Sequence, residues 1–355
     1  MKNNIEVCND YHRGKAVMES EKIVTFSIAA YNMERWLEPC IESLIDDSVM
    51  EQIEIIVVDD GSKDRTAKIA QEYVDRYPRS IKLISKVNGG YGSTINTSLS
   101  IAEGEFFKQV DGDDFIITEH LKEYLDVLRS TDADVVYAVG EYRYEDGSPT
   151  DTYNCHLTPR KEPYQPNEAA DRINLQLHCA TFRTSMLRKA KVNLPEHCMY
   201  TDLPLSLLGF CNATTVLSTP LHLYCSRIGR PGQSVSEEGY RKYVKDHAQV
   251  TILVASMRFG DAQLENLANR TSAGLYSNTM EILLGMSPTD SQKTLAVSLD
   301  KDIQKLRPSI FKEKCIAPAV RLMHITGCSA YVPLHGLALV KKAVKRVLKH
   351  VVGQA

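Results

Sequence analysis

Long apolar runs are missing from this 355-residue sequence. No segment approaches the roughly 18 to 20 apolar residues that a membrane-spanning helix needs, so we expect no such helix. The N-terminal stretch MKNNIEVCNDYHRGK is polar and lacks the apolar core and cleavage site of a secretory signal peptide. We therefore expect a cytoplasmic protein.

Patterns typical of zinc or disulfide sites are missing as well. The nine cysteines include no CxxC pair, and the ten histidines show no HExxH or HxxxH spacing. Reduced, mostly buried thiols are expected, and any metal ion should be held by oxygen atoms. The net charge is only −3, so no basic field recruits nucleic acid, and no nucleic-acid partner is expected.

Hydrophobic residues make up 43% of the chain, which is enough for a large core. Apolar, β-branched stretches such as VTFSIAA and IEIIVV alternate with amphipathic helical stretches. This alternation predicts an α/β domain over residues 23–235, with a Rossmann-like, mostly parallel sheet, helices on both faces, and ligands beyond the carboxyl ends of the strands. Further helices are expected over 169–174 and 203–209. A loose arm over 1–22 and a helical region over 236–355 complete the expected organisation.

The segment FFKQVDGDDF brings Asp111, Asp113 and Asp114 to the end of a predicted buried strand. Carboxylates crowded at a strand end repel one another. A Mg²⁺ or Mn²⁺ ion that bridges them to a diphosphate would compensate this charge. The alternative is an acidic turn that caps the helix beginning near Glu119.

A second acidic pair, Asp59 and Asp60, ends another predicted strand and suits hydrogen bonds to a base or a ribose. The alternative is again capping, and Ser62 and Asp64 are expected to cap the next helix in either case.

The turn VNGGYGSTIN places Gly89, Gly90 and Gly92 between a strand and a helix. Glycines there let backbone amides approach a ligand, although a glycine-rich turn alone is often only a turn.

Taken in order, SIAAYN, DDGS, NGGYGSTIN and DGDD resemble the motifs of the family 2 glycosyltransferases. These are inverting enzymes of the GT-A fold that use nucleotide-diphosphate sugars. The resemblance continues more weakly to GQSVS, and the NGGxGSTIN form with RxGQSVS is similar to the branch common in bacterial surface-polysaccharide synthesis. The usual stretch NxGxxxARNxG is altered, since Thr94, Ile95 and Ser98 stand at the Ala, Arg and second Gly positions. Contacts of that arginine do not carry over.

The resemblance implies roles for the matching residues. The implied contacts to the nucleotide sugar are Ala30, Tyr31, Asn32, Asp59, Asp60, Gly90 and Asp111. Asp60 would face the base. Asp111 and Asp113 take the places of the DxD motif and would hold Mg²⁺ or Mn²⁺, with Asp113 as the better direct ligand, while Asp114 would orient its neighbours.

The family also has a catalytic carboxylate at a helix start, usually in a Glu-Asp pair. Asp202 in MYTDLPLSLLGF takes that place, with Thr201 where the first acid usually stands. A half-buried position beside apolar groups would raise the pKa of Asp202 toward the range of a general base. The alternative is that Thr201 or Asp202 only caps the helix, and Glu196 is the reserve candidate for the base.

Two arginines and one histidine complete the candidates. Arg227 and Arg230 in RIGRPGQSVS suit bidentate recognition of the leaving diphosphate, with a solvated basic loop as the equal alternative. His178 lies in an otherwise apolar stretch and is interpreted as a core histidine with satisfied hydrogen bonds, not as a ligand.

These features predict an inverting transfer of a sugar from a nucleotide-diphosphate donor, a UDP-sugar, to a hydroxyl of a glycan or lipid-linked acceptor. One alternative is a sugar nucleotidyltransferase, which would want a glycine-rich basic signature that SIAAYNMERW lacks. The other is a glycan-binding scaffold of the same fold. The presence of Asp111, Asp113 and Asp202 argues against it, because a scaffold does not need these carboxylates.

The C-terminal segment LALVKKAVKRVLKHVV separates an apolar stripe from a cationic one at helical spacing. It predicts a basic amphipathic helix that rests on the inner face of the cell membrane, where lipid-linked acceptors lie. The alternative, that its apolar stripe packs on the rest of the protein, is equally compatible with the sequence.

Overall fold

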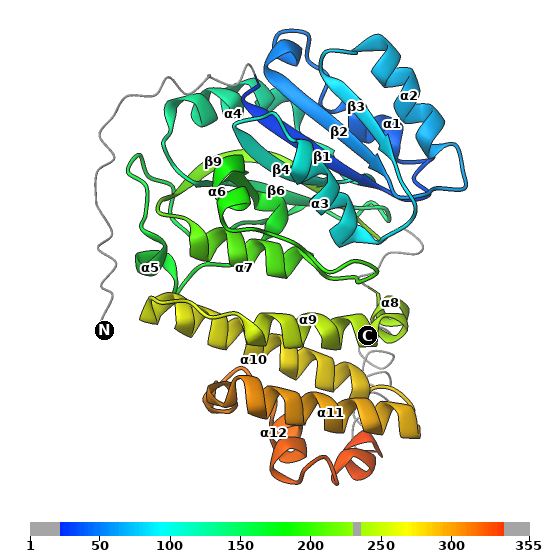
Figure 1. Ribbon diagram of the computed structural model, residues 1–355, viewed down its shortest axis with the longest axis vertical. Helices are drawn as coiled ribbons and strands as arrows, with labels where there is room; N and C mark the ends of the chain where they lie inside the picture. The colour runs from blue at the N-terminus through cyan, green and yellow to red at the C-terminus, as the bar shows by residue number, and fades with distance from the viewer. Residues whose placement is uncertain (1–21, 230–235, 337–355) are drawn as a thin grey trace, which may run out of the picture.

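The computed structural model describes residues 22–229 and 236–336 (Figure 1). Its central element is a nine-stranded sheet in which one half is purely parallel. The parallel half has the order β3 (Ile81–Ser85), β2 (Ile53–Asp59), β1 (Val24–Ala30) and β4 (Phe106–Asp111). Every residue of β1 and β2 is buried, as the continuous apolar runs predict for strands covered on both faces.

The other half of the sheet is mixed, so the prediction of a mostly parallel sheet holds for only part of it. Its strands are β8 (Ala180–Arg183), β6 (Val135–Tyr144), β9 (Val216–Ile228), β5 (Phe115–Ile116) and β7 (Asp151–Tyr153). β6 and β9 run parallel, but β8 is antiparallel to both β4 and β6, and β5 and β7 are antiparallel to their neighbours.

Helices cover both faces of the sheet, which confirms the α/β class. On one face, α1 (Leu37–Glu42), α2 (Thr66–Arg76) and α4 (Thr118–Ser130) pack apolar side chains against β1, β2 and β4. On the other face, α3 (Tyr91–Ile101), α6 (Thr184–Lys189) and α7 (Asp202–Asn212) pack apolar side chains against β4, β6 and β8. The prediction of a helix over 169–174 is wrong, because α5 is a single turn over Pro166–Ala169. Pro166 is the first residue of this turn, where the backbone N–H that proline lacks would have no helical partner in any case.

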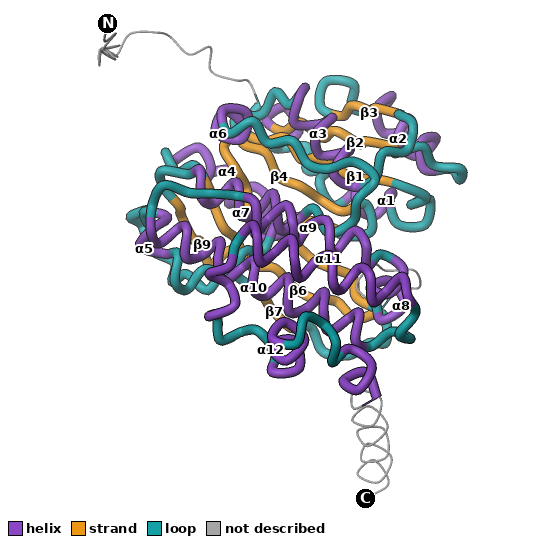
Figure 2. Tube along the Cα trace, turned by 60° about the horizontal axis from the view of Figure 1, so that its bottom comes forward, coloured by secondary structure: helices purple, strands orange, loops and turns teal. Residues whose placement is uncertain are grey.

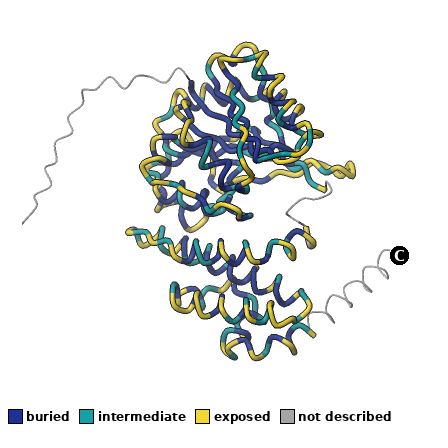
Figure 3. The backbone as a smooth tube through the Cα atoms, turned by 45° about the vertical axis from the view of Figure 1, so that its right-hand side comes forward, coloured by how far each residue is buried: buried dark blue, intermediate teal, exposed yellow. Residues whose placement is uncertain are grey.

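The described residues after 236 form helices and no strand. They are α8 (Glu237–Lys242), α9 (Val244–Ser256), α10 (Ala262–Leu284), α11 (Asp290–Leu306) and α12 (Pro318–Ile325). Figure 1 shows α9 next to α7 and α11 and α12 farther from the sheet, and Figure 2 turns this helical region toward the viewer. α9 and α10 bury side chains in two places, against α7 and in a separate core with α11 and α12, so they join the helical region to the sheet domain (Figure 3).

Within the described residues, no helix has the length and apolar character needed to cross a membrane. The predicted arm over 1–22 and the predicted amphipathic helix over 337–352 lie outside the described residues, apart from Lys22.

Candidate active site

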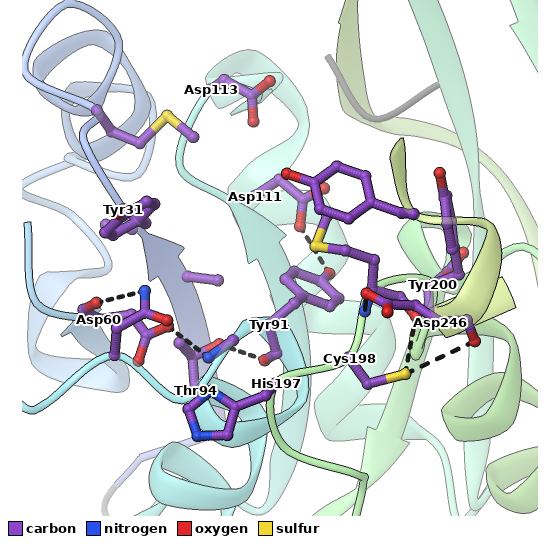
Figure 4. Close-up of a pocket in the computed structure, with 18 of the residues that line it drawn as sticks. Tyr31, Asp60, Tyr91, Thr94, Asp111, Asp113, His197, Cys198, Tyr200 and Asp246 are labelled. Carbon is purple, nitrogen blue, oxygen red and sulfur yellow. Dashed lines mark hydrogen bonds between the residues drawn. The ribbon is translucent and has the colours of Figure 1, made fainter. Parts of the chain in front are cut away.

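The carboxyl ends of β1, β2 and β4 meet at one edge of the sheet and open into a cleft of ≈ 660 Å³. The parallel register places Ala30 beside Asp59, and Ala29 beside Asp111, so residues from distant motifs converge there. The predicted site residues that line the cleft are Ala30, Tyr31, Asn32, Asp60, Gly90, Asp111, Asp113 and Asp202. Figure 4 labels Tyr31, Asp60, Asp111 and Asp113 among them. Asp59 and Arg227 are not among the lining residues, and Arg230 lies outside the described residues.

The two carboxylates at the end of β2 have different surroundings. Asp59 is buried, and its Oδ1 accepts a hydrogen bond from the Ser62 backbone amide at 3.0 Å, so it holds the turn after the strand. Asp60 faces the cleft, yet its carboxylate binds the glycine-rich turn: Oδ2 accepts from Gly90 N at 2.7 Å, and Oδ1 accepts from Gly89 N at 2.9 Å. Lys86 Nζ donates to the same Oδ1 at 3.0 Å.

These bonds correct two sequence interpretations. The amides of Gly89 and Gly90, expected to approach a ligand, are directed to Asp60 instead. Of the two expected caps, Asp64 does bind the start of α2, through the Thr66 amide at 3.0 Å. Ser62 does not cap, because its Oγ accepts from the Asn32 backbone amide at 2.9 Å.

Residues 194–201, which we call the strap, run along the glycine-rich turn and lead into α7. Asn96 in α3 both donates to Leu194 O at 2.8 Å and accepts from Leu194 N at 2.9 Å. A Cβ on Gly92 would lie 2.5 Å from Pro195 O, so only glycine allows the strap to pass there. Further along, His197 N donates to Gly89 O. The strap is thus fixed to the turn that Asp60 holds.

Three carboxylates follow β4. Asp111 Oδ1 accepts from the Tyr91 hydroxyl at 2.7 Å, and Asp113 faces the cleft from the same loop (Figure 4). Asp114 points inward, where it accepts from the Tyr224 hydroxyl at 2.8 Å and from the Arg227 backbone amide at 2.9 Å. Burial and the nearby carboxylates of Asp113 and Asp111 raise the pKa of Asp114 well above its usual value. This is the charge crowding expected from the sequence.

His178 lines the cleft, so its interpretation as a satisfied core histidine is wrong. It lies in a 3₁₀ turn (Leu177–Cys179), and its ring stacks on Tyr224 at 4.7 Å between centroids. Nε2 lies 3.8 Å from Asp111 Oδ2, while Nδ1 is buried with no hydrogen-bond partner. Burial lowers the pKa of His178 to about 4, so the ring is neutral near pH 7 and can offer a lone pair.

Ligand atoms of Asp111, Asp114 and His178 lie within 4.8 Å of one another, a spacing that could hold a cation. A donor set of two carboxylates and a neutral imidazole is suited to a divalent ion. A nitrogen ligand was not expected from the sequence, which indicated oxygen atoms only. The side chain of Lys108, buried in β4, holds this turn in place by donating to His178 O at 2.8 Å.

Asp202 begins α7 and lines the cleft in a half-buried position. No side chain of the described residues donates a hydrogen bond to its carboxylate. Burial raises its pKa, against the opposing effects of His178 and the amides at the helix start. Thr201 occupies the N-cap position without capping, and its buried Oγ1 has no partner. Glu196 is exposed and is not a lining residue, which leaves Asp202 as the carboxylate of this segment that faces the cleft.

Arg227 lies away from the cleft lining. Its guanidinium carbon is 4.7 Å from the ring centroid of Phe115 and 5.3 Å from that of Trp36. Its backbone amide donates to Asp114 Oδ1 at 2.9 Å and so supports the acidic loop. The contact of its side chain with the diphosphate stays a prediction.

The sequence analysis missed the second wall of the cleft. Asp246 in α9 and Tyr243, the residue just before α9, line it from the helical region, and Met199 and Tyr200 line it from the strap. Asp246 Oδ2 accepts from Met199 N at 3.0 Å and joins the two elements. No motif marks these residues, and only the amphipathic pattern of α9 signals that one of its faces is packed.

Comparison with known proteins places the chain in context. The model of the family described as "Glycosyl transferase family 2" matches residues 25–193. The uncharacterized glycosyltransferase EpsJ of Bacillus subtilis is 29% identical over 236 residues, covering 64% of this chain and 67% of EpsJ. A poly(ribitol-phosphate) beta-glucosyltransferase of Bacillus spizizenii is 26% identical over 181 residues, covering 49% of this chain but only 27% of that protein. The share of the relatives' own length that is matched therefore varies widely.

Among solved structures, residues 1–349 of TarS from S. aureus superpose with a TM-score of 0.64, covering 88% of this chain and 89% of the TarS chain. At 16% identity this similarity concerns the fold. The match reaches well beyond residue 228, so it includes part of the helical region. The family match over residues 25–193, the related glycosyltransferases and the shared architecture together support a family 2 glycosyltransferase with the GT-A fold.

Proposed function

We propose that the protein transfers a sugar from a UDP-sugar to a hydroxyl of a glycan or lipid-linked acceptor, with inversion at the anomeric carbon. The observation that carries this proposal is the arrangement of carboxylates in one cleft. Asp111 and Asp113 face it from the end of β4, and Asp202 faces it from the start of α7. An enzyme of this type needs a charge-binding group for the diphosphate and a separate base for the acceptor.

The donor lies along the ends of β1 and β2 in this proposal. The loop Ala30 to Asn32 lines that side, together with Asp60 and Gly90. Asp60 Oδ2 accepts a hydrogen bond from Gly90 N, and a carboxylate oxygen has room for a second donor such as an N–H of the base. TarS, which shares the fold, has been solved with UDP-GlcNAc, and this supports uridine as the base.

A divalent cation, Mg²⁺ or Mn²⁺, would be held by Asp111 and Asp113, with His178 beside Asp111. It would neutralise charge that develops on the leaving diphosphate. Asp114 does not line the cleft and each of its oxygens accepts one hydrogen bond, but it lies close enough to Asp111 and His178 to contribute a further ligand atom. Among the lining residues in the described part of the chain there is no lysine or arginine, so those residues offer no cationic side chain to the diphosphate.

Asp202 acts as the general base. A raised pKa makes a carboxylate a better proton acceptor, and burial raises that of Asp202. As the acceptor oxygen bonds to the anomeric carbon, its proton passes to Asp202 and the bond from that carbon to the diphosphate oxygen breaks. One base and one displacement lead to inversion, with no covalent intermediate.

The acceptor belongs to surface-polysaccharide synthesis in this proposal. The names of related proteins support this assignment. They include the poly(ribitol-phosphate) beta-glucosyltransferase and the minor teichoic acid biosynthesis protein GgaB of Bacillus subtilis, which is 39% identical over 87 residues. A lipid-linked acceptor would place the enzyme at the inner face of the cell membrane, and the basic segment over 337–352 would attach it there.

Calorimetric titration with a panel of nucleotide sugars, with and without Mn²⁺, tests the proposal. A glycosyltransferase should bind one UDP-sugar and bind it more tightly with the metal. A glycan-binding scaffold should bind none. A sugar nucleotidyltransferase would instead release pyrophosphate from a nucleoside triphosphate and a sugar phosphate, which a pyrophosphate assay detects.

A further inference from the structure

The cleft has two chemically different walls. The strand-end wall carries Asp60, Asp111 and Asp113, whereas the opposite wall, which we call the α9 wall, consists of Met199, Tyr200, Tyr243 and Asp246. Figure 4 shows Tyr200 and Asp246 across the cleft from Tyr31 and Asp60, with Asp111 and Tyr91 between the two sides. Asp202 follows the strap directly, so the candidate base lies at the boundary of the α9 wall.

The α9 wall is held rigidly. Asp246 accepts from Met199 N at 3.0 Å, and Cys198 Sγ donates to Asp246 O at 3.8 Å. Tyr200 has a left-handed backbone, with φ 64°, and its ring stacks on Tyr240 at 5.7 Å with 16° between the planes. A non-glycine residue in that conformation needs such support, because the backbone itself disfavours it. The surface is therefore shaped before any ligand binds.

We infer that the α9 wall is the acceptor subsite and that it takes a neutral, hydroxyl-rich sugar ring. This inference rests on the proposed function. In an inverting displacement the acceptor attacks from the side opposite the leaving diphosphate, and the acceptor hydroxyl must also reach the base. With the diphosphate at Asp111 and Asp113, the space that satisfies both conditions is the one between Asp202 and the α9 wall.

The side chains on this wall indicate the ligand's chemistry. Tyrosine faces are electron-rich and attract the C–H faces of a sugar ring, while their hydroxyls and the Asp246 carboxylate pair with sugar hydroxyls. The α9 wall contains no lysine or arginine, and Asp202 and Asp246 together make it acidic. A phosphate or carboxylate on the acceptor ring would be repelled there, so charged groups of a longer acceptor lie outside this subsite.

Kinetics with acceptor analogues provide the test. The probes are p-nitrophenyl glycosides of neutral sugars and the matching uronides, with the donor held at saturation. Tyr243→Ala should raise the acceptor KM by about tenfold, Tyr243→Phe should raise it less, and both should leave the donor KM within about twofold. Asp246→Asn keeps an oxygen for Met199 N but removes the charge. It should therefore lower the ratio of kcat/KM for neutral acceptors to kcat/KM for anionic acceptors by about tenfold.

Lys245→Ala is the matched control, since Lys245 is an exposed neighbour on α9 that does not line the cleft. It should change neither acceptor KM nor acceptor preference. Hydrolysis of the donor without acceptor, together with calorimetric donor binding, reports folding and the donor site in every variant. Unchanged acceptor KM in Tyr243→Ala, or a wild type that prefers uronides, would overturn the subsite while donor binding persists. Absence of donor binding in the wild type would instead refute the proposed function.

Discussion

Substitutions of Asp202 and of Asp113 should affect different steps: the first should slow the chemical step, and the second should weaken donor binding. Asp202→Asn preserves the size of the side chain but cannot accept the acceptor's proton at useful rates. We expect kcat to fall at least about 100-fold, which corresponds to a barrier about 2.7 kcal/mol higher. Donor affinity should stay within about twofold, because Asp202 begins α7 and the proposed diphosphate ligands follow β4. Asp113→Ala should instead abolish the Mn²⁺-dependent part of donor binding.

The pH dependence of the reaction gives an independent reading of the same base. Burial raises the pKa of Asp202 above its usual value of 3.8. A general base works only when deprotonated, so kcat/KM of the wild type should rise with pH through this raised pKa and then level off. Asp202→Asn should lack that acidic limb, because the amide does not titrate there.

The assay follows release of the nucleoside diphosphate at saturating acceptor, and calorimetry measures donor binding in parallel. Glu196→Gln is the control, since Glu196 lies six residues earlier along the chain, is exposed and does not line the cleft. Its kcat should match the wild type. If Asp202→Asn turned over within a few-fold of the wild type, the base assignment would be wrong. If Asp113→Ala bound donor with an unchanged response to Mn²⁺, the metal assignment would fail.

Three other outcomes are expected. NMR of the first product made from an α-linked donor should show a β-linkage, and an α-linked product would refute the single displacement. Gly92→Ala should lower the free energy of unfolding in urea by about 1 to 3 kcal/mol, because its Cβ would meet Pro195 O at 2.5 Å, whereas Gly274→Ala in α10, with no atom within 4 Å, should be neutral or stabilising. Full-length protein should co-sediment with anionic vesicles at low salt and less with neutral ones, and a truncation ending at His335 should not; equal failure of both proteins would exclude the membrane role.

The parallel half of the sheet could be predicted because its strands are long, fully buried and separated by clear helices. Seven consecutive buried residues in β1 and in β2 leave a strong signal in the sequence. The mixed half could not be predicted, since β8 has four residues and β5 has two, too few to show a period. Their direction is set by pairing with β4, β6 and β9, which are distant in the sequence.

The same distinction applies to the site. Asp60, Asp111 and Asp113 follow parallel strands, and the ends of parallel strands meet at one edge, so their convergence could be predicted from the sequence. His178 lies beside Asp111 because β8 pairs with β4, and Tyr243 and Asp246 reach the cleft because α9 packs on α7. Both placements depend on long-range packing that leaves no local pattern.

The glycine-rich turn shows how a motif can be recognised while its physical role is misread. Its amides bind Asp60, and its carbonyl at Gly89 receives His197 N, so the turn connects the end of β2 to the strap. In the strap, Met199 N donates a hydrogen bond to Asp246 of α9, and the strap leads directly into Asp202, the first residue of α7. The position of Asp202 therefore depends on contacts from both the strand-end wall and the helical region. This explains why a segment without a family motif of its own belongs to the same structural unit as the cleft.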